Sequence, residues 1–363
     1  MTTLLNNKID FIVTFDIDYA NPNGDPIADN MPRTTFDGYG LVSDVALKRK
    51  LRNRLQDMFA DDNDNENYRI FVQSTDRAND GIQSLETRFS QAFDKDTLKS
   101  LTLSELNEKI NQQWLDVRSF GQVFTNKITT KEGSGKLPQS VRGAVSISPA
   151  TSTEPIEITS MQITTSTNRE EKEGKKDSST MGMKQFIEHA TYVFQGTISP
   201  TIAEKTGFTE EDAELIKQAL VTLFENDQSA ARPSGSMAVR NVYWFTHNNK
   251  IGNVSTSRIR HLLSYNTDTN DFELNENKLT VYKNKGLHLD IIEGLYSENE
   301  FLRLSSLRNF SYCKHLWALK DLEDYWSDNY YTTKGHLTHQ KTDNPFIEDK
   351  RKDILIVRSL HTS

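Results

Sequence analysis

The stretch "IDFIVTFDID", residues 9–18, alternates apolar and polar side chains along its length. Ile9, Phe11 and Val13 fall on every second position, which is the period of a strand with one buried face. A segment rich in proline and glycine follows at 21–40 and ends the run. The stretch therefore predicts the first strand of a sheet.

A helix is expected directly after the turn-rich segment. Ser43 is a favourable N-cap residue, and Leu47, Leu51 and Leu55 recur at the spacing of one buried helix face. A second helix is expected over 209–226. Its start has a capping-box-like pair, with Thr209 followed three positions later by Asp212.

Further alternating runs predict more strands. The predicted strands are 9–18, 141–148, 190–198 and 239–247. Together with the two helices, they give the order strand, helix, strand, strand, helix, strand, which is the ferredoxin-like pattern that RNA-recognition domains share. The predicted class is α+β.

Two long insertions interrupt this pattern. The first, about 60–138, is expected to be helical, most clearly at "TLSELNEKINQQWL". The second, about 150–188, contains the stretch 165–180, which has no apolar residue and is expected to be a solvated loop or arm tip. We expect one domain over 1–264 and a mixed, mostly helical C-terminal extension over 265–363.

Composition limits the classes of protein. The chain has 363 residues, a net charge of -8 and a single cysteine, Cys313. One cysteine excludes a disulfide framework and a cysteine-rich metal site. We expect no signal peptide and no membrane span, so the predicted location is a reducing cytoplasm.

The basic residues are concentrated in one run. "KRKLRNR", residues 48–54, carries five cations in seven residues. No acid occurs from 45 to 56, whereas solvated helix faces usually mix both signs. Two hypotheses stay open from this feature alone, a solvated helix face and a contact with nucleic acid.

The turn "NPNGDP", residues 21–26, also has several interpretations. Three interpretations stay open: a stiff turn, a place where the backbone at Gly24 approaches a ligand, and a metal site with a carboxylate from Asp25 or Asp29. Divalent-metal chemistry needs two or more convergent carboxylates. Because the sequence does not show such convergence, we expect no catalytic residue here.

Other catalytic signatures are absent from the sequence. There is no phosphate-binding loop, dinucleotide fingerprint or hydrolase elbow. His336 and His339 lack further metal ligands at a familiar spacing, and Cys313 lies in an apolar run typical of a buried residue. We therefore expect no cofactor and no metal.

Several dispersed motifs occur in an order typical of one known family. They are "FDIDYANPNGDP", "NMPR", "GYGLVSDVALKRKLRNRL", "DVRSFGQVF", "VRGAVSIS", "TMGMK", "SAAR" and "NVYWFTH". As a set, over roughly residues 8–264, they resemble the backbone subunit of CRISPR Cascade complexes, the Cas-seven family, and its subtype I-C member in particular.

The resemblance implies a hand-shaped fold and a non-catalytic role in antiviral defence. A ferredoxin-like palm would carry helical fingers and a protruding thumb. Copies would stack head to tail along a CRISPR guide RNA and present it to target DNA, with other Cascade subunits as further partners and no membrane contact. Each thumb would kink the guide.

The resemblance also implies particular RNA contacts. The loop over the guide backbone would contribute Asn23, Gly24 and Arg33, and the basic helix would contribute Ser43, Lys48, Arg49 and Arg52. The thumb would contribute Lys184 and Met183, the latter as an apolar wedge. Other family motifs would contribute Arg118, Arg142 and Arg232. Two features depart from the family pattern. "PSGS" lengthens the loop after Arg232, and the residues 265–363 extend the chain.

Two competing functions remain at this stage. One is a metal-dependent RNA endonuclease subunit of the type III kind, with Asp25 as its loop aspartate. The other is an interaction module with an unrelated ligand. Because a lone carboxylate repels phosphate, we expect Asp25 to bond to a loop N–H or to an arginine such as Arg33.

Overall fold

The computed structural model describes residues 3–59, 68–78, 80–124, 127–131, 133–136, 141–164 and 181–295. The polar stretch 165–180, Cys313, His336, His339 and the extension beyond 295 lie outside the described residues.

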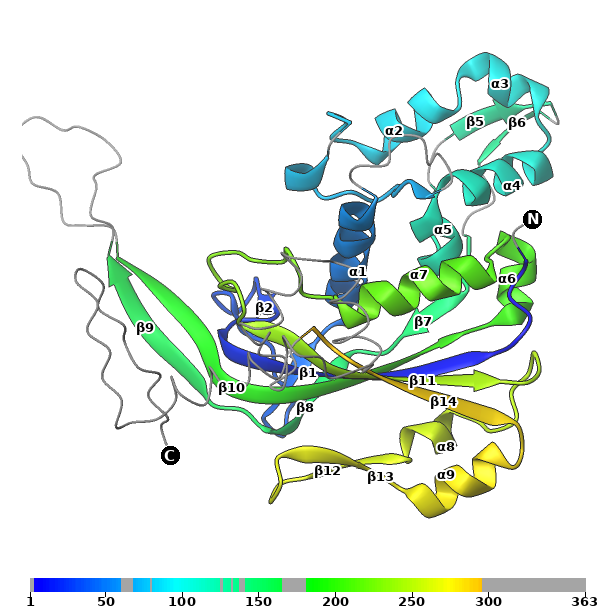
Figure 1. The fold of residues 1–363 in the computed structure, drawn as a ribbon. Helices are drawn as coiled ribbons and strands as arrows, with labels where there is room; N and C mark the ends of the chain where they lie inside the picture. Colours follow the sequence, from blue (N-terminus) through cyan, green and yellow to red (C-terminus); the bar gives the residue numbers. More distant parts are fainter. Residues whose placement is uncertain are drawn as a thin grey trace, which may run out of the picture. The chain divides into compact units, whose positions relative to one another are not determined.

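One antiparallel sheet of eight strands organises the described part of the chain (Figure 1). Its strands are β1 (Ile9–Ala20), β4 (Tyr39–Val42), β7 (Val145–Ile147), β8 (Ala150–Pro155), β9 (Ile158–Thr164), β10 (Met181–Ile198), β11 (Met237–His247) and β14 (Leu287–Glu293). The order is β14-β11-β1-β10-β8-β4, and β7 and β9 also pair with β10. The predicted mixed α and β class is confirmed, and the strand predicted over 9–18 is present as β1. The expectation of one buried face was wrong, because Asp10, Ile12 and Thr14 are buried as well as Phe11 and Phe15: the sheet is covered on both faces.

Three helices cover one face of the sheet: α1 (Asp44–Met58), α6 (Pro200–Thr206) and α7 (Glu210–Val221). Phe11 and Phe15 of β1 are fully buried in the same cluster as Leu51 of α1 and Ile216 of α7. Both predicted helix starts are confirmed, since Ser43 caps α1 and the Thr209–Asp212 capping box is present.

The opposite face is covered by residues that follow β11. They form α8 (Thr256–Arg260), β12 (Leu263–Asn266), β13 (Asp271–Leu274) and α9 (Glu276–Lys283). Ile12 of β1 and Phe245 of β11 pack there against Ile259 and Leu279. The chain then returns as β14, which pairs along β11 and extends the sheet beyond residue 264.

The first insertion has its own core. Its elements are η2 (Thr75–Arg77), α2 (Leu85–Ala92), α3 (Lys95–Ser100), α4 (Leu103–Gln113), α5 (Leu115–Phe120), β5 (Lys127–Thr130) and β6 (Gly133–Lys136). Trp114 lies at the centre of an aromatic cluster with Phe71, Phe89 and Phe93. The helical signal of this segment is therefore confirmed, and the aromatic residues explain why it packs separately from the sheet.

The second insertion begins and ends in a long hairpin. β9 and β10 pair from Ile158 opposite Ile187 to Thr164 opposite Met181, and the hairpin projects from the sheet (Figure 1). The strand predicted over 141–148 is shorter than expected, because β7 begins at Val145. Before it, Gly143 packs against the backbone of Gly121, where a Cβ on Gly143 would lie 2.4 Å from the Gly121 nitrogen.

Candidate nucleic-acid interface

The loop between β1 and α1 is tied to the start of α1. Asn23 Oδ1 accepts a hydrogen bond from the Ser43 backbone N–H at 3.0 Å, and the Arg33 N–H donates to the Asn23 carbonyl at 3.2 Å. Ser43 Oγ accepts from the Ala46 N–H at 3.3 Å. The structure thus brings together Asn23 and Arg33 of the loop and Ser43 of the helix, three residues that the family resemblance implies as RNA contacts.

Gly24 has a structural requirement in this loop. It lies in the short strand β2 (Gly24–Asp25), which pairs with β3 (Met31–Pro32). A Cβ on Gly24 would lie 2.1 Å from Asn30 Oδ1 and 2.8 Å from the Asn30 carbonyl oxygen. Only glycine fits without a shift of this turn, so Gly24 shapes the loop whether or not a ligand approaches it.

Asp25 makes the protein contacts that were predicted for it. Its Oδ1 accepts from the Ile27 N–H at 3.1 Å, and its Oδ2 accepts from Arg33 Nη1 at 3.4 Å. Both side chains of the ion pair remain about one third exposed. Asp25 therefore stabilises the turn and neutralises part of the charge of Arg33.

The cations of α1 have partners from distant segments. Arg52 Nε donates to Asp116 Oδ2 of α5 at 2.8 Å, and Lys50 is paired with Asp227 in the loop after α7. Lys48 is paired at 2.9 Å with Asp44, one helical turn earlier. The acid-free run 45–56 thus does not indicate uncompensated charge, because Lys50 and Arg52 are paired with acids from distant segments.

The remaining two cations of the run donate to neutral oxygens. Arg49 Nη1 donates to the Val72 carbonyl at 2.7 Å, and Arg54 Nε donates to Thr222 Oγ1 at 2.7 Å. Burial lowers the pKa of Arg49, and the nearby Arg52 lowers it further. Burial likewise lowers the pKa of Lys50 to about 8, against the raising effect of Asp227.

Arg232 lies close to α1 through a shared acid. Its Nε is 2.9 Å from Asp227 Oδ2, the carboxylate that also pairs with Lys50. The Asn21 N–H donates to the Ala231 carbonyl, which fastens this loop to the end of β1. The lengthened "PSGS" loop therefore still leaves Arg232 beside the loop that follows β1.

Arg118 and Arg142 occupy different environments. Arg118 is buried, and its Nε and Nη2 donate to the two carboxylate oxygens of Asp212 at 2.9 and 2.8 Å. This bidentate pair joins α5 to the first turn of α7, so Arg118 is a structural residue in the described fold. Arg142 is exposed and has no ion pair within the described residues.

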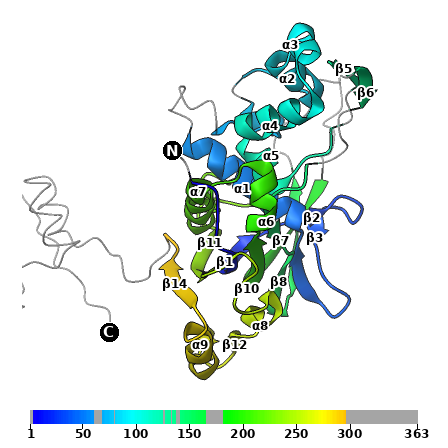
Figure 2. The same cartoon turned by 90° about the vertical axis from the view of Figure 1, so that its right-hand side faces the viewer.

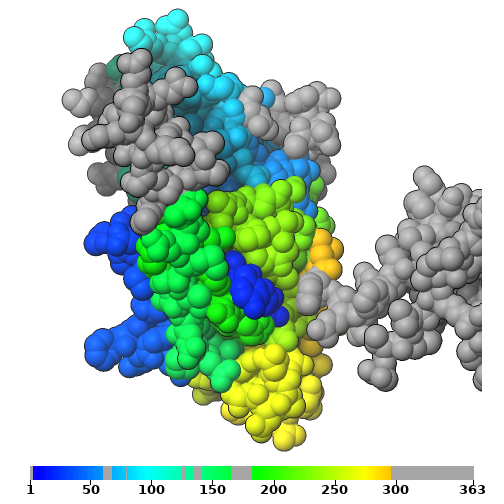
Figure 3. All heavy atoms as spheres, turned by 90° about the vertical axis from the view of Figure 1, so that its left-hand side faces the viewer, coloured from blue at the N-terminus to red at the C-terminus, as the bar shows by residue number. Residues whose placement is uncertain are grey.

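Met183 and Lys184 lie on the β9–β10 hairpin. Met183 is 58% exposed and stands opposite Gln162. Lys184 is half-buried, stands opposite Met161 and has no ion pair among the described side chains. Figure 3 views the molecule from the side toward which this hairpin, in green, projects.

The family model described as CRISPR-associated protein Cas7 matches residues 7–288. The chain belongs to the Cas7 family. A curated relative of the same description, from Haloferax volcanii, is 26% identical over 288 residues, which are 75% of this chain and 78% of the relative. The family match spans the loop after β1, both insertions and the strands of the sheet up to the start of β14.

Two solved structures also resemble this Cas7-family chain. One is described as a pre-nicking CRISPR RNA-guided surveillance complex, with a TM-score of 0.43 and 14% identity over 77% of this chain and 87% of that one. The other, described as a CRISPR RNA-guided surveillance complex, has a TM-score of 0.42 and 13% identity over 81% and 91%.

The described part of this Cas7-family chain has neither a cluster of metal-ligating side chains nor a membrane-spanning helix. No group of three or more histidine, cysteine, aspartate or glutamate side chains is arranged to hold a metal ion there. No helix in the same residues is both long enough and apolar enough to cross a membrane.

Sequence reasoning missed the acids that compensate the basic helix. Asp116 and Asp227 lie 64 and 177 positions from the cations that they pair with. "DVRSFGQVF" did include Asp116, but as part of a family motif rather than as a partner of Arg52. No local pattern signals such a pair, because the contact depends on how the insertion packs against α1.

Proposed function

We propose that the chain is a non-catalytic, guide-RNA-binding backbone subunit of a type I CRISPR Cascade complex, of subtype I-C. The observation that carries the proposal is the Cas7-family match over 7–288. That range includes the loop after β1, the basic helix α1 and the β9–β10 hairpin, which are the segments to which RNA contacts were assigned.

The strand order supports a ferredoxin-like palm. β11, β1, β10 and β7 are neighbours in that order, all antiparallel, with α1 after β1 and α7 after β10. This is the arrangement expected of two interleaved strand–helix–strand units. In this proposal the segment α2–α5 forms the fingers, and β9 with the start of β10 forms the thumb.

The burial of the cations separates direct RNA contacts from supporting residues. Lys48 and Arg33 are partly exposed, as are their partner acids Asp44 and Asp25, so each pair is worth little and phosphate can displace the carboxylate. Arg142 and Lys184 have no competing acid among the described residues. These four side chains are the proposed phosphate contacts.

Arg52 and Arg118 have a supporting role in the proposal. Their carboxylate partners, Asp116 and Asp212, are almost completely buried. A buried pair is costly to break because the remaining charge is left uncompensated. Both arginines therefore hold the α1–α5–α7 framework that positions the loop and α1, and they do not turn toward RNA.

Copurification with nucleic acid tests the proposal first. The purified protein should show a high ratio of absorbance at 260 to 280 nm, and ribonuclease but not deoxyribonuclease should lower it. Binding to a guide RNA should weaken with salt, with a log–log slope of about 0.7 per phosphate contacted for single-stranded RNA. Protein free of nucleic acid, with no affinity for guide RNA at low salt, would contradict the proposal.

A further inference from the structure

The turn over residues 34–40, here called the Phe36 turn, presents an apolar side chain to solvent. Phe36 is fully exposed, which is unusual for an aromatic residue. Its turn is well bonded: the Thr35 N–H donates to the Tyr39 carbonyl at 2.7 Å, and Tyr39 N–H donates to Thr35 Oγ1 at 3.1 Å. Phe36 is therefore held outward by the backbone in a defined position.

The residue after Phe36 adds a charge. Asp37 is exposed and makes no ion pair or hydrogen bond within the described residues. Asp29, in the neighbouring turn beside the fully exposed Ile27, is exposed as well. Because these acids repel phosphate, the exposed apolar tips favour a protein partner over nucleic acid.

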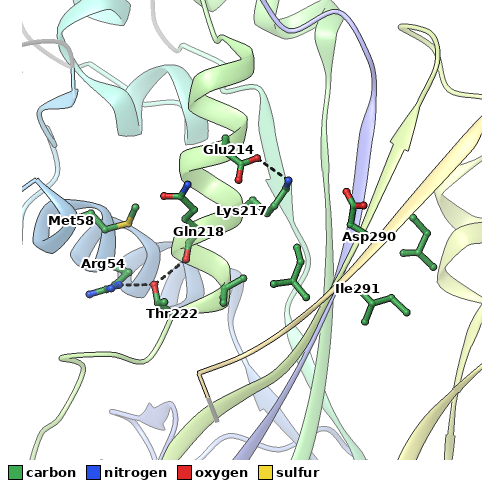
Figure 4. Close-up of a pocket in the computed structure, with 11 residues that line it drawn as sticks. Arg54, Met58, Glu214, Lys217, Gln218, Thr222, Asp290 and Ile291 are labelled. Atoms are coloured by element: carbon green, nitrogen blue, oxygen red, sulfur yellow. Dashed lines mark hydrogen bonds and ion pairs between the residues drawn. The ribbon is translucent and has the colours of Figure 1, made fainter. Parts of the chain in front are cut away.

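A groove of suitable character lies between α7 and β14 (Figure 4). This α7–β14 groove has a volume of about 820 Å³. Met58 of α1 and Ile291 of β14 stand on opposite sides of it, and Ile291 is half exposed. Since β14 is the last strand of the sheet in the described chain, the groove is open at the sheet edge.

One cation in the groove lacks an acid. Lys217 is paired with Glu214 at 2.8 Å, and Asp290 Oδ1 lies 2.9 Å from His288 Nε2. Arg54 donates only to the neutral Thr222 hydroxyl and has no ion pair among the described side chains. The groove thus offers an apolar wall beside an uncompensated arginine, and the Phe36 turn offers an aromatic residue beside an uncompensated aspartate.

The turn and the groove lie at opposite edges of the sheet. The Phe36 turn leads into β4, and the groove lies beside β14, which is at the other end of the strand order. Figure 2 shows the segment around β2 and β3, in blue, on one side and α7 with β14 on the other. Figure 3, drawn from the opposite direction, agrees: dark blue atoms lie on one side of the molecule and orange atoms on the other. Two different surfaces on opposite sides can join copies head to tail in an open array.

We propose that the Phe36 turn of one copy docks into the α7–β14 groove of the next, with Phe36 against Met58 and Ile291, and Asp37 against Arg54. The inference rests on the proposed function, because it names the surfaces by which copies on one guide would meet. A single aromatic anchor in an apolar pocket, with one desolvated charge pair, is the usual pattern of an interface hot spot.

Substitution at the anchor tests the contact. Phe36→Ala should raise the protein concentration needed for multi-copy assembly on a long guide RNA at least tenfold, measured by sedimentation. Ile251→Ala, at another almost fully exposed apolar residue, should leave assembly unchanged. Unchanged assembly by the Phe36 variant would overturn the proposal.

A short RNA that accommodates one copy separates this inference from the proposed function. Phe36→Ala should bind the short RNA as the unsubstituted protein does. If the variant instead loses affinity for the short RNA, Phe36 contacts RNA and the docking proposal is wrong. If neither protein binds RNA, the proposed function fails. The docking contact is then tested by sedimentation of the protein alone at high concentration. Phe36→Ala should again need about tenfold more protein than the unsubstituted chain to assemble.

Charge exchange tests the second contact. Asp37→Arg and Arg54→Asp should each weaken assembly about tenfold, and the double variant should recover most of it. Thermal unfolding of each variant controls for the lost bond to Thr222. No recovery in a folded double variant would overturn the pairing of Asp37 with Arg54.

Cross-linking locates the two surfaces directly. Phe36→Cys and Ile291→Cys are placed in separate chains that both carry Cys313→Ser. A short bismaleimide should give dimers only when the two chains are mixed and assembled on RNA. Assembled arrays without mixed dimers would overturn the assignment of these surfaces.

Discussion

Arg52 of α1 and Asp116 of α5 form an ion pair of 2.8 Å in which the aspartate is fully buried. Asp116 also accepts from the N–H groups of Phe71 and Val72, at 2.7 and 3.1 Å. The Asp116 carboxylate therefore links three parts of the chain: α1, the backbone of residues 71 and 72, and α5 of the helical insertion. The helix to which the family resemblance assigns RNA contacts is also the element that anchors the insertion.

This pair separates two substitutions that look equivalent in the sequence. Arg52→Ala should lower the free energy of unfolding by about 3 kcal/mol, because Asp116 stays buried without its cation. Lys48→Glu breaks only a partly exposed pair and should change the free energy of unfolding by less than about 1 kcal/mol. Urea unfolding of both variants checks this, and equal losses would contradict the assignment.

Lys48 should contribute little to stability but should matter for RNA binding. Lys48→Glu, while still folded, should weaken guide-RNA binding and reduce the salt slope by about one, as expected when a phosphate contact is lost. Lys278→Glu on the exposed surface of α9 is the matched control. If both variants weaken binding equally, the effect is one of overall charge and Lys48 is not a contact.

Arg118 should act through stability alone. Arg118→Ala is expected to lower the free energy of unfolding by about 3–5 kcal/mol, since it leaves Asp212 buried and unpaired at the start of α7. The double variant Arg118→Met with Asp212→Leu should recover much of that loss. A folded Arg118→Ala protein of normal stability that fails to bind RNA would instead favour direct contact.

Lys50 should give stability a dependence on alkaline pH. In the unfolded chain Lys50 keeps its proton up to about pH 10.5, whereas burial lowers its folded pKa to about 8. Between these values the unfolded state binds more protons, so stability relative to Lys50→Met rises with pH, by about 1.4 kcal/mol per unit. Urea unfolding of both proteins from pH 7 to 10.5 measures this, and a constant difference would contradict it.

Asp25 should support its loop without catalysing RNA cleavage. Asp25→Ala removes the contacts to Arg33 and the Ile27 N–H, so it should loosen the turn and modestly weaken guide binding. Incubation of the assembled protein with complementary RNA and Mg²⁺ or Mn²⁺ should give no cleavage with either form. Cleavage that is lost in the variant would favour the endonuclease alternative.

The sequence alone determined the local elements that depend on periodicity and capping. The apolar runs predicted the strands β1 and β11, and Ser43 and Thr209 predicted the helix starts, because strand period and capping depend on neighbouring residues. That both faces of β1 are buried did not follow from its sequence, since it depends on residues that fold over the sheet from elsewhere in the chain. The contacts of Asp25 with Ile27 and Arg33 could also be predicted, since they lie two and eight positions away.

Only the tertiary structure decided which cations are free and where the sheet ends. Arg52 and Lys50 find their acids in segments 64 and 177 positions away, and β14 joins β11 after the chain has covered the opposite face of the sheet. These contacts arise from packing between distant segments. The residues that neighbour a charge or an apolar run in the sequence do not reveal which distant residue it contacts. Whether a cation is paired, or an apolar run is buried, is therefore decided only by the folded chain.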